Sequence, residues 1–288
     1  MIRILSSARK ISHQELQPAL DWLESENLKY SLSKNIAASQ NQFCGSDEQR
    51  AQDIIDALND ESVNAIWCAR GGYGSIRVWK VLNAKGVKIT KPIFGYSDVT
   101  VWFCNAYKAS ELAFHSVMGI DLPKATEKAK KSLAYAFRKL EMDTLNWKSV
   151  EQQNLELEGN LFGGNLSMLY SLSGTELMPD KHGDDLILML EDLDEYLYHV
   201  DRMMNNLSLQ GYWKRVKAIV CGALTDMNDN TIPFGENALD IVKRHASENG
   251  IPLFTNAPFG HFSDNQCWQV GKKVNLFQKG NDCVIQPI

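Results

Sequence analysis

The sequence has no apolar run that approaches the roughly 18 residues of a membrane-spanning helix. It has no surplus of basic residues either, because its 288 residues include 35 Asp and Glu against 30 Lys and Arg, for a net charge of −5. Nucleic acids and anionic membranes favour basic surfaces, so neither is an expected partner. Near the start of the chain, Arg3 and Arg9 leave too short an uncharged interval for a signal-peptide core. The cytoplasm is therefore the expected compartment.

The motifs that hold metals and nucleotides are absent as well. The six histidines form no His-Glu-x-x-His motif, and the chain has neither a Walker loop nor a G-x-G-x-x-G turn. We therefore expect no metal and no cofactor. The six cysteines include no Cys-x-x-Cys pair, and several lie in apolar, strand-like segments. This setting favours buried, reduced thiols over a disulfide framework.

What is present is the composition of a globular protein, with 44% hydrophobic and 23% charged residues, and a length that suits one or two domains. Ser12-His-Gln-Glu15 and Ser46-Asp-Glu-Gln49 have the form of capping boxes, and each opens a segment with one apolar helical face. Strand-like segments at Ile2–Leu5, Ala65–Ala69 and before Phe94 alternate with helices. Such alternation predicts an α/β fold with an open, largely parallel sheet flanked by helices.

The domain boundaries follow from composition. We assign residues 1–145 to an N-terminal α/β domain and the polar stretch 146–158 to a linker. Residues 159–288 are predicted to form a smaller, mixed α/β domain. Its last part has short alternating segments at Gln269–Leu276 and Cys283–Ile285, which suit antiparallel hairpins.

The stretch Phe94-Gly-Tyr-Ser-Asp98 lies between an apolar strand and a predicted helix. Strand, tight turn, serine and helix is the layout of a nucleophile elbow, which lifts the serine hydroxyl above the sheet edge. The second glycine of the usual G-x-S-x-G pattern is missing here. A second interpretation of Ser97 is therefore a plain helix N-cap. Ser75, which also follows a glycine turn, is the competing nucleophile.

Two further polar residues lie where functional loops of parallel sheets are expected. Glu191 directly follows the apolar run Leu186–Leu190, and His261 follows Pro258-Phe-Gly260. Taken alone, Glu191 reads as a helix-start acid and His261 as a loop histidine. With Ser97 they supply nucleophile, acid and base in the chain order of the α/β-hydrolases. Glu195 is the competing acid, but its place beyond the strand end favours Glu191.

Six segments of the chain carry a family resemblance. They are Arg70-Gly-Gly-Tyr-Gly74, Phe94-Gly-Tyr-Ser-Asp98, His115 before a Val-Met-Gly, Gly163-Gly-Asn-Leu166, Leu190-Glu-Asp with Glu195 and Asp201-Arg202, and Phe259-Gly-His261. With these segments in this order, the chain resembles the LD-carboxypeptidases, serine peptidases that trim murein tetrapeptides, and the related microcin-immunity peptidases. The resemblance extends from about Ala65 to His261.

The resemblance implies a serine peptidase with Ser97 as nucleophile, His261 as general base and Glu191 as the acid that orients the imidazole. It implies an oxyanion hole built from the backbone N–H groups of Gly72 and Asp98. The implied substrate is a small, murein-derived peptide, cut between a diamino acid and a terminal D-alanine. The family works in the cytoplasm without a metal and is commonly a homodimer.

A terminal carboxylate on such a substrate suits a cationic partner, for which Arg70 and Arg202 are the candidates. Two alternatives remain open at this stage. One is an immunity-type peptidase or amidase that acts on another peptide or a peptide–nucleotide. The other is a catalytically silent protein that keeps the fold and binds a peptide.

Overall fold

The computed structural model describes residues 1–109, 112–179, 183 and 185–288. The chain divides into two compact units, and each contains one sheet. The first unit comprises residues 1–142 and 263–269, and the second comprises residues 143–262 and 270–288. The first unit thus takes a short segment from the C-terminal part of the chain. No helix among the described residues is long and apolar enough to cross a membrane.

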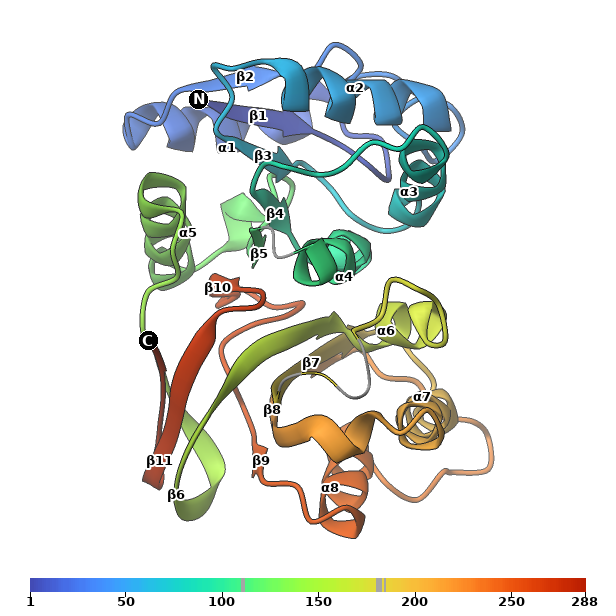
Figure 1. Cartoon of the computed structure of the whole chain (residues 1–288), viewed down its shortest axis with the longest axis vertical. Coiled ribbons are helices and arrows are strands. Elements are labelled where there is room, and N and C mark those ends of the chain that lie inside the picture. The colour runs from blue at the N-terminus through green and yellow to red at the C-terminus, as the bar shows by residue number, and fades with distance from the viewer. Residues whose placement is uncertain (110–111, 180–182, 184) are drawn as a thin grey trace. The chain divides into compact units, whose positions relative to one another are not determined.

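The first unit is built on a six-stranded sheet in the order β10-β5-β4-β3-β1-β2 (Figure 1). Strands β1 to β5 are all parallel, and only β10 joins its neighbour β5 in the antiparallel sense. The predicted open, largely parallel sheet is therefore confirmed. The strands are β1 (Ile2–Leu5), β2 (Tyr30–Leu32), β3 (Ala65–Cys68), β4 (Ile93–Gly95), β5 (Ala113–His115) and β10 (Trp268–Gln269).

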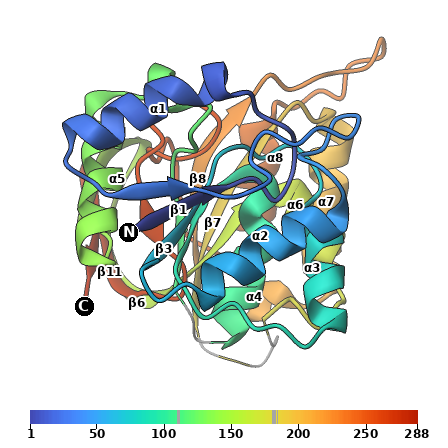
Figure 2. The same ribbon diagram turned by 90° about the horizontal axis from the view of Figure 1, so that it is seen from above.

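Helices cover both faces of this sheet. Figure 2 shows α1 and α5 on one side of β1 and β3, with α2, α3 and α4 on the other. Both predicted capping boxes are present, with Ser12 opening α1 and Ser46 opening α2. The helices are α1 (His13–Ser25), α2 (Asp47–Asn59), α3 (Ser75–Ala84), α4 (Thr100–Ala109) and α5 (Glu127–Lys139).

Aromatic side chains fill the core under α1 and α5. Phe94 of β4 and Phe114 of β5 stack with ring centroids 4.4 Å apart and nearly parallel planes. Phe137 of α5 packs 4.7 Å from Phe94 and 5.5 Å from the fully buried Trp67 of β3. This packing anchors strand β4 directly before the turn that carries Ser97.

The second unit has a five-stranded sheet in the order β11-β6-β7-β8-β9. Strands β6 to β9 are parallel, and β11 is antiparallel to β6. The strands are β6 (Leu145–Asn165), β7 (Leu186–Leu193), β8 (Val216–Thr225), β9 (Leu253–Phe254) and β11 (Lys273–Pro287). The helices are α6 (Leu166–Leu172), α7 (Leu197–Leu209) and α8 (Ala238–Glu248).

Two expectations about this half of the chain were wrong. The segment 146–158 is no linker, because it lies inside β6 and pairs with β11 on both sides of one register shift, from Leu145↔Ile285 to Lys148↔Asp282 and from Gln153↔Gly280 to Glu158↔Asn275. The tail segments 269–276 and 283–285 do not form their own hairpins, because residues 273–287 are one strand on β6. Strands β6 and β11 form a two-stranded ribbon. Much of β6 in it alternates between exposed and partly buried positions, so its polar composition resembles that of a linker.

A glycine allows β6 and β7 to approach closely where β6 ends. Gly163 has φ +144°, and a Cβ built on it would lie 1.9 Å from the carbonyl oxygen of Met189 in β7. Any side chain at this position therefore collides with backbone rather than with a movable side chain.

We expect Gly163→Ala to destabilise the second unit by more than about 4 kcal/mol, because relief of the overlap requires β6 and β7 to separate. The matched control is Gly250→Ala. Gly250 also has positive φ (+62°), but nothing lies within 4 Å of its added methyl group. There the cost is the left-handed conformation alone, about 1 kcal/mol. Denaturant unfolding of both variants measures the difference, and equal losses would contradict the steric account.

Candidate active site

Ser97 occupies the turn that the sequence predicts. It lies one residue beyond the end of β4, after Tyr96, and opens the short 3₁₀ helix η1 (Ser97–Val99), which runs into α4. Its φ of +62° is left-handed, a conformation that costs a non-glycine residue roughly 1–2 kcal/mol. Tyr96 before it and Asp98 and Val99 after it are buried, while Ser97 itself stays partly exposed. The fold therefore presents the Ser97 hydroxyl outward at the C-terminal end of a parallel strand, at the cost of local strain.

The loop between β3 and α3 runs past this serine. A Cβ built on Gly71 would lie 3.4 Å from the Ser97 Cβ and 3.5 Å from the Tyr96 carbonyl oxygen. The next residue, Gly72, is exposed with φ +104°. Its N–H donates to no carbonyl among the described residues. The Gly72 N–H, one residue after the glycine that approaches Ser97, thus has no backbone acceptor in the described part of the chain, as a donor in an oxyanion hole requires.

In the second unit, Glu191 and His261 form a hydrogen-bonded pair. His261 Nδ1 lies 2.6 Å from Glu191 Oε2, and the Glu191 side chain is fully buried whereas that of His261 is 12% exposed. A carboxylate can only accept in this bond, so Nδ1 carries the proton and Nε2 is left as a base. The arrangement fixes the imidazole tautomer in the way that a catalytic histidine requires.

The competing acid has another partner. Glu195 Oε2 lies 2.6 Å from Nδ1 of His199, one turn further along the chain. Tyr170 packs edge-on against the same imidazole, with ring centroids 5.6 Å apart. The structure therefore brings Glu191, and not Glu195, to His261.

The other nucleophiles are poorly placed for catalysis. Ser75 is fully buried, and its hydroxyl lies 2.8 Å from that of Ser7. All six cysteines are free and buried. Burial raises the pKa of the Cys44 and Cys283 thiols to about 11 and of the Cys68 thiol to about 12. These groups are therefore neutral thiols near neutral pH.

The two predicted carboxylate-binding arginines have different surroundings. The Arg70 guanidinium lies 3.4 Å from Glu15 and 3.3 Å from the Lys10 carbonyl oxygen, with its side chain 32% exposed. Arg202 is exposed on α7 and packs over the Tyr198 ring, 5.2 Å from its centroid. Arg70 directly precedes the Gly71–Gly74 loop, which passes Ser97. Arg202 contacts an aromatic ring of its own helix, α7.

A buried acid that the sequence analysis missed lies beside Glu191. Asp192 accepts hydrogen bonds from the Asn165 side chain at 2.8 Å and from the Ser167 N–H at 2.9 Å, and so fixes the start of α6 against β7. Burial, and then the neighbouring Glu191 carboxylate, raise the pKa of Asp192 to about 7. The adjacent Glu-Asp pair at a strand end was the available signal.

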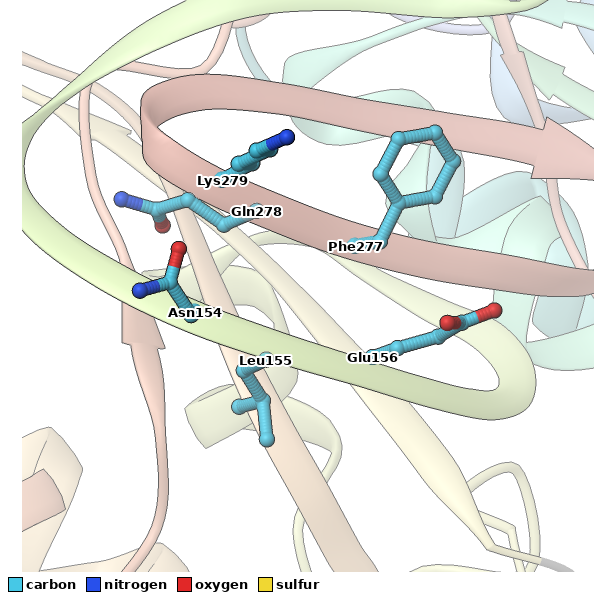
Figure 3. Close-up of a pocket in the computed structure, with 6 residues that line it drawn as sticks. All are labelled: Asn154, Leu155, Glu156, Phe277, Gln278 and Lys279. Carbon is cyan, nitrogen blue, oxygen red and sulfur yellow. The ribbon is translucent and has the colours of Figure 1, made fainter.

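One surface hollow, of about 490 Å³, lies on the β6–β11 ribbon of the second unit. Figure 3 shows its lining, with Asn154, Leu155 and Glu156 on one strand and Phe277, Gln278 and Lys279 on the other. It is open and holds none of the predicted site residues. Across the described residues, no group of three His, Cys, Asp or Glu side chains could hold a metal ion.

Both halves of the chain match models of known protein domains. Residues 2–118 match the LD-carboxypeptidase N-terminal domain, and residues 158–276 match the LD-carboxypeptidase C-terminal domain. A carboxypeptidase homologue of Rickettsia conorii is 31% identical, over 82% of this chain and 75% of its own length. The chain belongs to the LD-carboxypeptidase family.

Other relatives agree with this assignment. The murein tetrapeptide carboxypeptidase of Pseudomonas aeruginosa is 27% identical, over 96% of this chain and 92% of its own. The crystal structure of muramoyltetrapeptide carboxypeptidase from Oxalobacter formigenes superposes with a TM-score of 0.84 at 26% identity, covering 99% of both chains. The microcin C7 self-immunity protein MccF has a TM-score of 0.83 at 17% identity, which shows a shared fold.

The Glu191–His261 pair yields a direct prediction. Glu191→Gln should lower kcat of the carboxypeptidase reaction by about 10² to 10⁴, because an amide that donates to Nδ1 stabilises the wrong imidazole tautomer. Glu195→Gln is the matched control, since it makes the same change beside His199, and kcat should stay within a few-fold of the unaltered protein. The assignment of the acid is wrong if the Glu195 variant is the crippled one.

Proposed function

We propose that this protein is a serine carboxypeptidase of the LD type. It would hydrolyse the bond between the L-centre of a diamino acid and a terminal D-alanine in small peptides derived from the cell wall. The observation that carries the proposal is the buried Glu191–His261 hydrogen bond at 2.6 Å in a chain whose two halves match the two LD-carboxypeptidase domains. The relatives named for murein tetrapeptides supply the substrate class.

In the proposed mechanism Ser97, His261 and Glu191 act as a triad. His261 Nε2 takes the proton of the Ser97 hydroxyl as the oxygen attacks the scissile carbonyl, because a neutral serine is a weak nucleophile. The buried Glu191 carboxylate stabilises the imidazolium that forms. His261 then returns the proton to the amino group of the leaving D-alanine, and water hydrolyses the acyl-enzyme with the same base.

The Gly72 and Asp98 backbone N–H groups are the proposed oxyanion donors. Their support is the exposed Gly72, which directly follows the glycine that approaches Ser97, together with the place of Asp98 directly after the nucleophile. Donors of this kind stabilise the tetrahedral intermediate by several kcal/mol, since each is typically worth about 10² to 10³ in rate. No step in this mechanism uses a metal or a cofactor.

We propose Arg70 as the first candidate to hold the substrate's terminal carboxylate and Arg202 as the second. Arg70 is bound only loosely to Glu15, at 3.4 Å, so a substrate carboxylate can compete for its guanidinium. Arg202 has its charge over an aromatic face and its side chain in solvent. We also propose a cytoplasmic location, in keeping with six free cysteine thiols.

A panel of peptides tests the reaction and its nucleophile together. The protein should release D-alanine from tetrapeptides that end in diaminopimelate-D-Ala or L-Lys-D-Ala, and should leave the L-Ala isomers intact. Ser97→Ala should lower kcat by about 10³ or more while the fold stays intact, since the triad acts as a unit. Mass spectrometry should map a fluorophosphonate adduct to Ser97.

The control for this prediction is Ser75→Ala, which removes a buried hydroxyl that we place outside the triad. That variant should still react with the fluorophosphonate. An adduct on Ser75 would refute the assignment of Ser97. Labelling without release of D-alanine from any peptide of the panel would instead favour an amidase or immunity-type substrate.

We further propose that the protein is a homodimer. Leu209 and Ile232 of the second unit are 89% and 84% exposed, and association would remove such apolar surface from water. Light scattering should give a molar mass twice the 32.5 kDa of one chain at micromolar concentration. A mass of one chain at that concentration would contradict the proposal.

A further inference from the structure

The side chain of Asp98, the residue after the proposed nucleophile, points into the protein. It is 1% exposed, and its Oδ2 accepts a hydrogen bond from the backbone N–H of Ser75 at 2.8 Å. Burial raises the pKa of this carboxyl, and hydrogen bonds from Ser75 and from the Gly74 N–H act in the opposite direction. Oδ2 of this buried carboxyl therefore bonds to the backbone at one short stretch, whereas Oδ1 has no hydrogen-bond partner among the described residues.

That stretch is the N-terminus of α3. Gly74 is the N-cap residue and has no side chain that could accept a hydrogen bond from the first turn. Asp98 takes over this task from a different element, and it places an acidic group where the helix dipole favours one. The start of α3 is thus attached to the turn that carries Ser97 by the hydrogen bond from the Ser75 N–H to the Asp98 carboxyl.

Further hydrogen bonds between buried side chains support this attachment. The Ser75 hydroxyl lies 2.8 Å from that of Ser7, which in turn accepts from the indole N–H of Trp102 at 3.3 Å. Ser7, Ser75 and Asp98 are all buried, and Trp102 is 1% exposed. Water therefore does not compete for these hydrogen bonds, and the buried network holds its residues rigidly.

The segment directly before Gly74 is the one that passes Ser97. Gly71 lies in contact distance of the Ser97 Cβ, and its carbonyl accepts from the Arg9 N–H at 3.3 Å. Gly72 and Tyr73 are exposed and make no backbone hydrogen bond with the described residues, and their contacts are with the Arg9 side chain and the Phe43 ring, respectively. The backbone on both sides of Gly72 therefore fixes the position of its amide. On one side Gly71 contacts the Ser97 turn, and on the other side Asp98 holds the N-terminus of α3.

We propose that the Asp98 carboxylate is a positioning residue for the oxyanion hole. By capping α3 it fixes the Gly72 N–H relative to the Ser97 hydroxyl, although its own side chain touches no substrate. The inference rests on the proposed function, because it takes Ser97 as the nucleophile. It adds a role for the Asp98 side chain beside that of its backbone N–H.

The rate at which a fluorophosphonate labels Ser97 tests this without any assumption about the natural substrate. Phosphonylation builds negative charge on an oxygen next to the attacked phosphorus, so it depends on the same preorganised donors. Asp98→Ala should lower the maximal labelling rate constant about 100-fold and leave the half-saturating probe concentration nearly unchanged. Asp98→Asn should recover most of the rate, because its amide oxygen can still accept from the Ser75 N–H.

The matched control is Ser46→Ala, which removes the N-cap of the neighbouring helix α2 and should leave the labelling rate unchanged. If Asp98→Ala yields no folded protein, Asp98→Ser replaces it, since serine is polar but too short to reach the Ser75 N–H. The inference is overturned if Asp98→Ala labels at an unaltered rate, if Ser46→Ala loses as much of the rate, or if Asp98→Asn recovers none of it. Failure of the unaltered protein to label at Ser97 would overturn the proposed nucleophile, and this inference with it.

Discussion

The hydrogen bond between the fully buried Glu191 carboxylate and His261 constrains much of the second unit. A carboxylate without a partner in such a place would cost several kcal/mol, so the loop that delivers His261 must come close. Gly260 makes this approach possible, because a Cβ there would lie 2.9 Å from the Glu191 Cβ and φ is +114°. Thr225 at the end of β8 adds a longer contact, 3.4 Å, from its hydroxyl to the His261 carbonyl oxygen.

Of the four acidic residues buried in the described part of the chain, Asp98, Glu191 and Asp192 lie at or next to the residues of the proposed triad, and each accepts hydrogen bonds. Glu191 accepts from an imidazole, which keeps a base ready on the other ring nitrogen. Asp98 accepts from the backbone at the start of α3, and Asp192 from the backbone and a side chain at the start of α6. Only the first arrangement leaves a group that can move a proton. The other two fix backbone, and the sequence motifs Tyr-Ser-Asp and Leu-Glu-Asp place each such acid next to a residue of the proposed triad.

The sequence was most informative where local patterns decide the structure. The capping boxes at Ser12 and Ser46 and the turn at Ser97 depend on residues close together in the chain, and the parallel sheet of the first unit follows from the alternation of strands and helices. The prediction failed for strand pairs that no such alternation connects. Strand β11 lies on β6 more than 100 residues earlier, and β10 lies on β5 of the first unit. Nothing in a polar, alternating stretch such as 146–158 says which partner it will find, so a linker was the wrong interpretation.

The limits of prediction were similar at the site. The strand-end rule could place Glu191 ahead of Glu195, but the distance to His261 and the separate Glu195–His199 pair required coordinates. The motif could not show that the Asp98 side chain points inward, because a local motif does not indicate which helix N-terminus elsewhere in the chain its carboxyl will reach. The hydrogen bonds that fix the Ser97 turn all belong to the first unit, and the Glu191–His261 bond belongs to the second. Each unit therefore holds its own part of the proposed machinery through its own hydrogen bonds, and the left-handed Ser97 lies in a turn supported by contacts within the same unit.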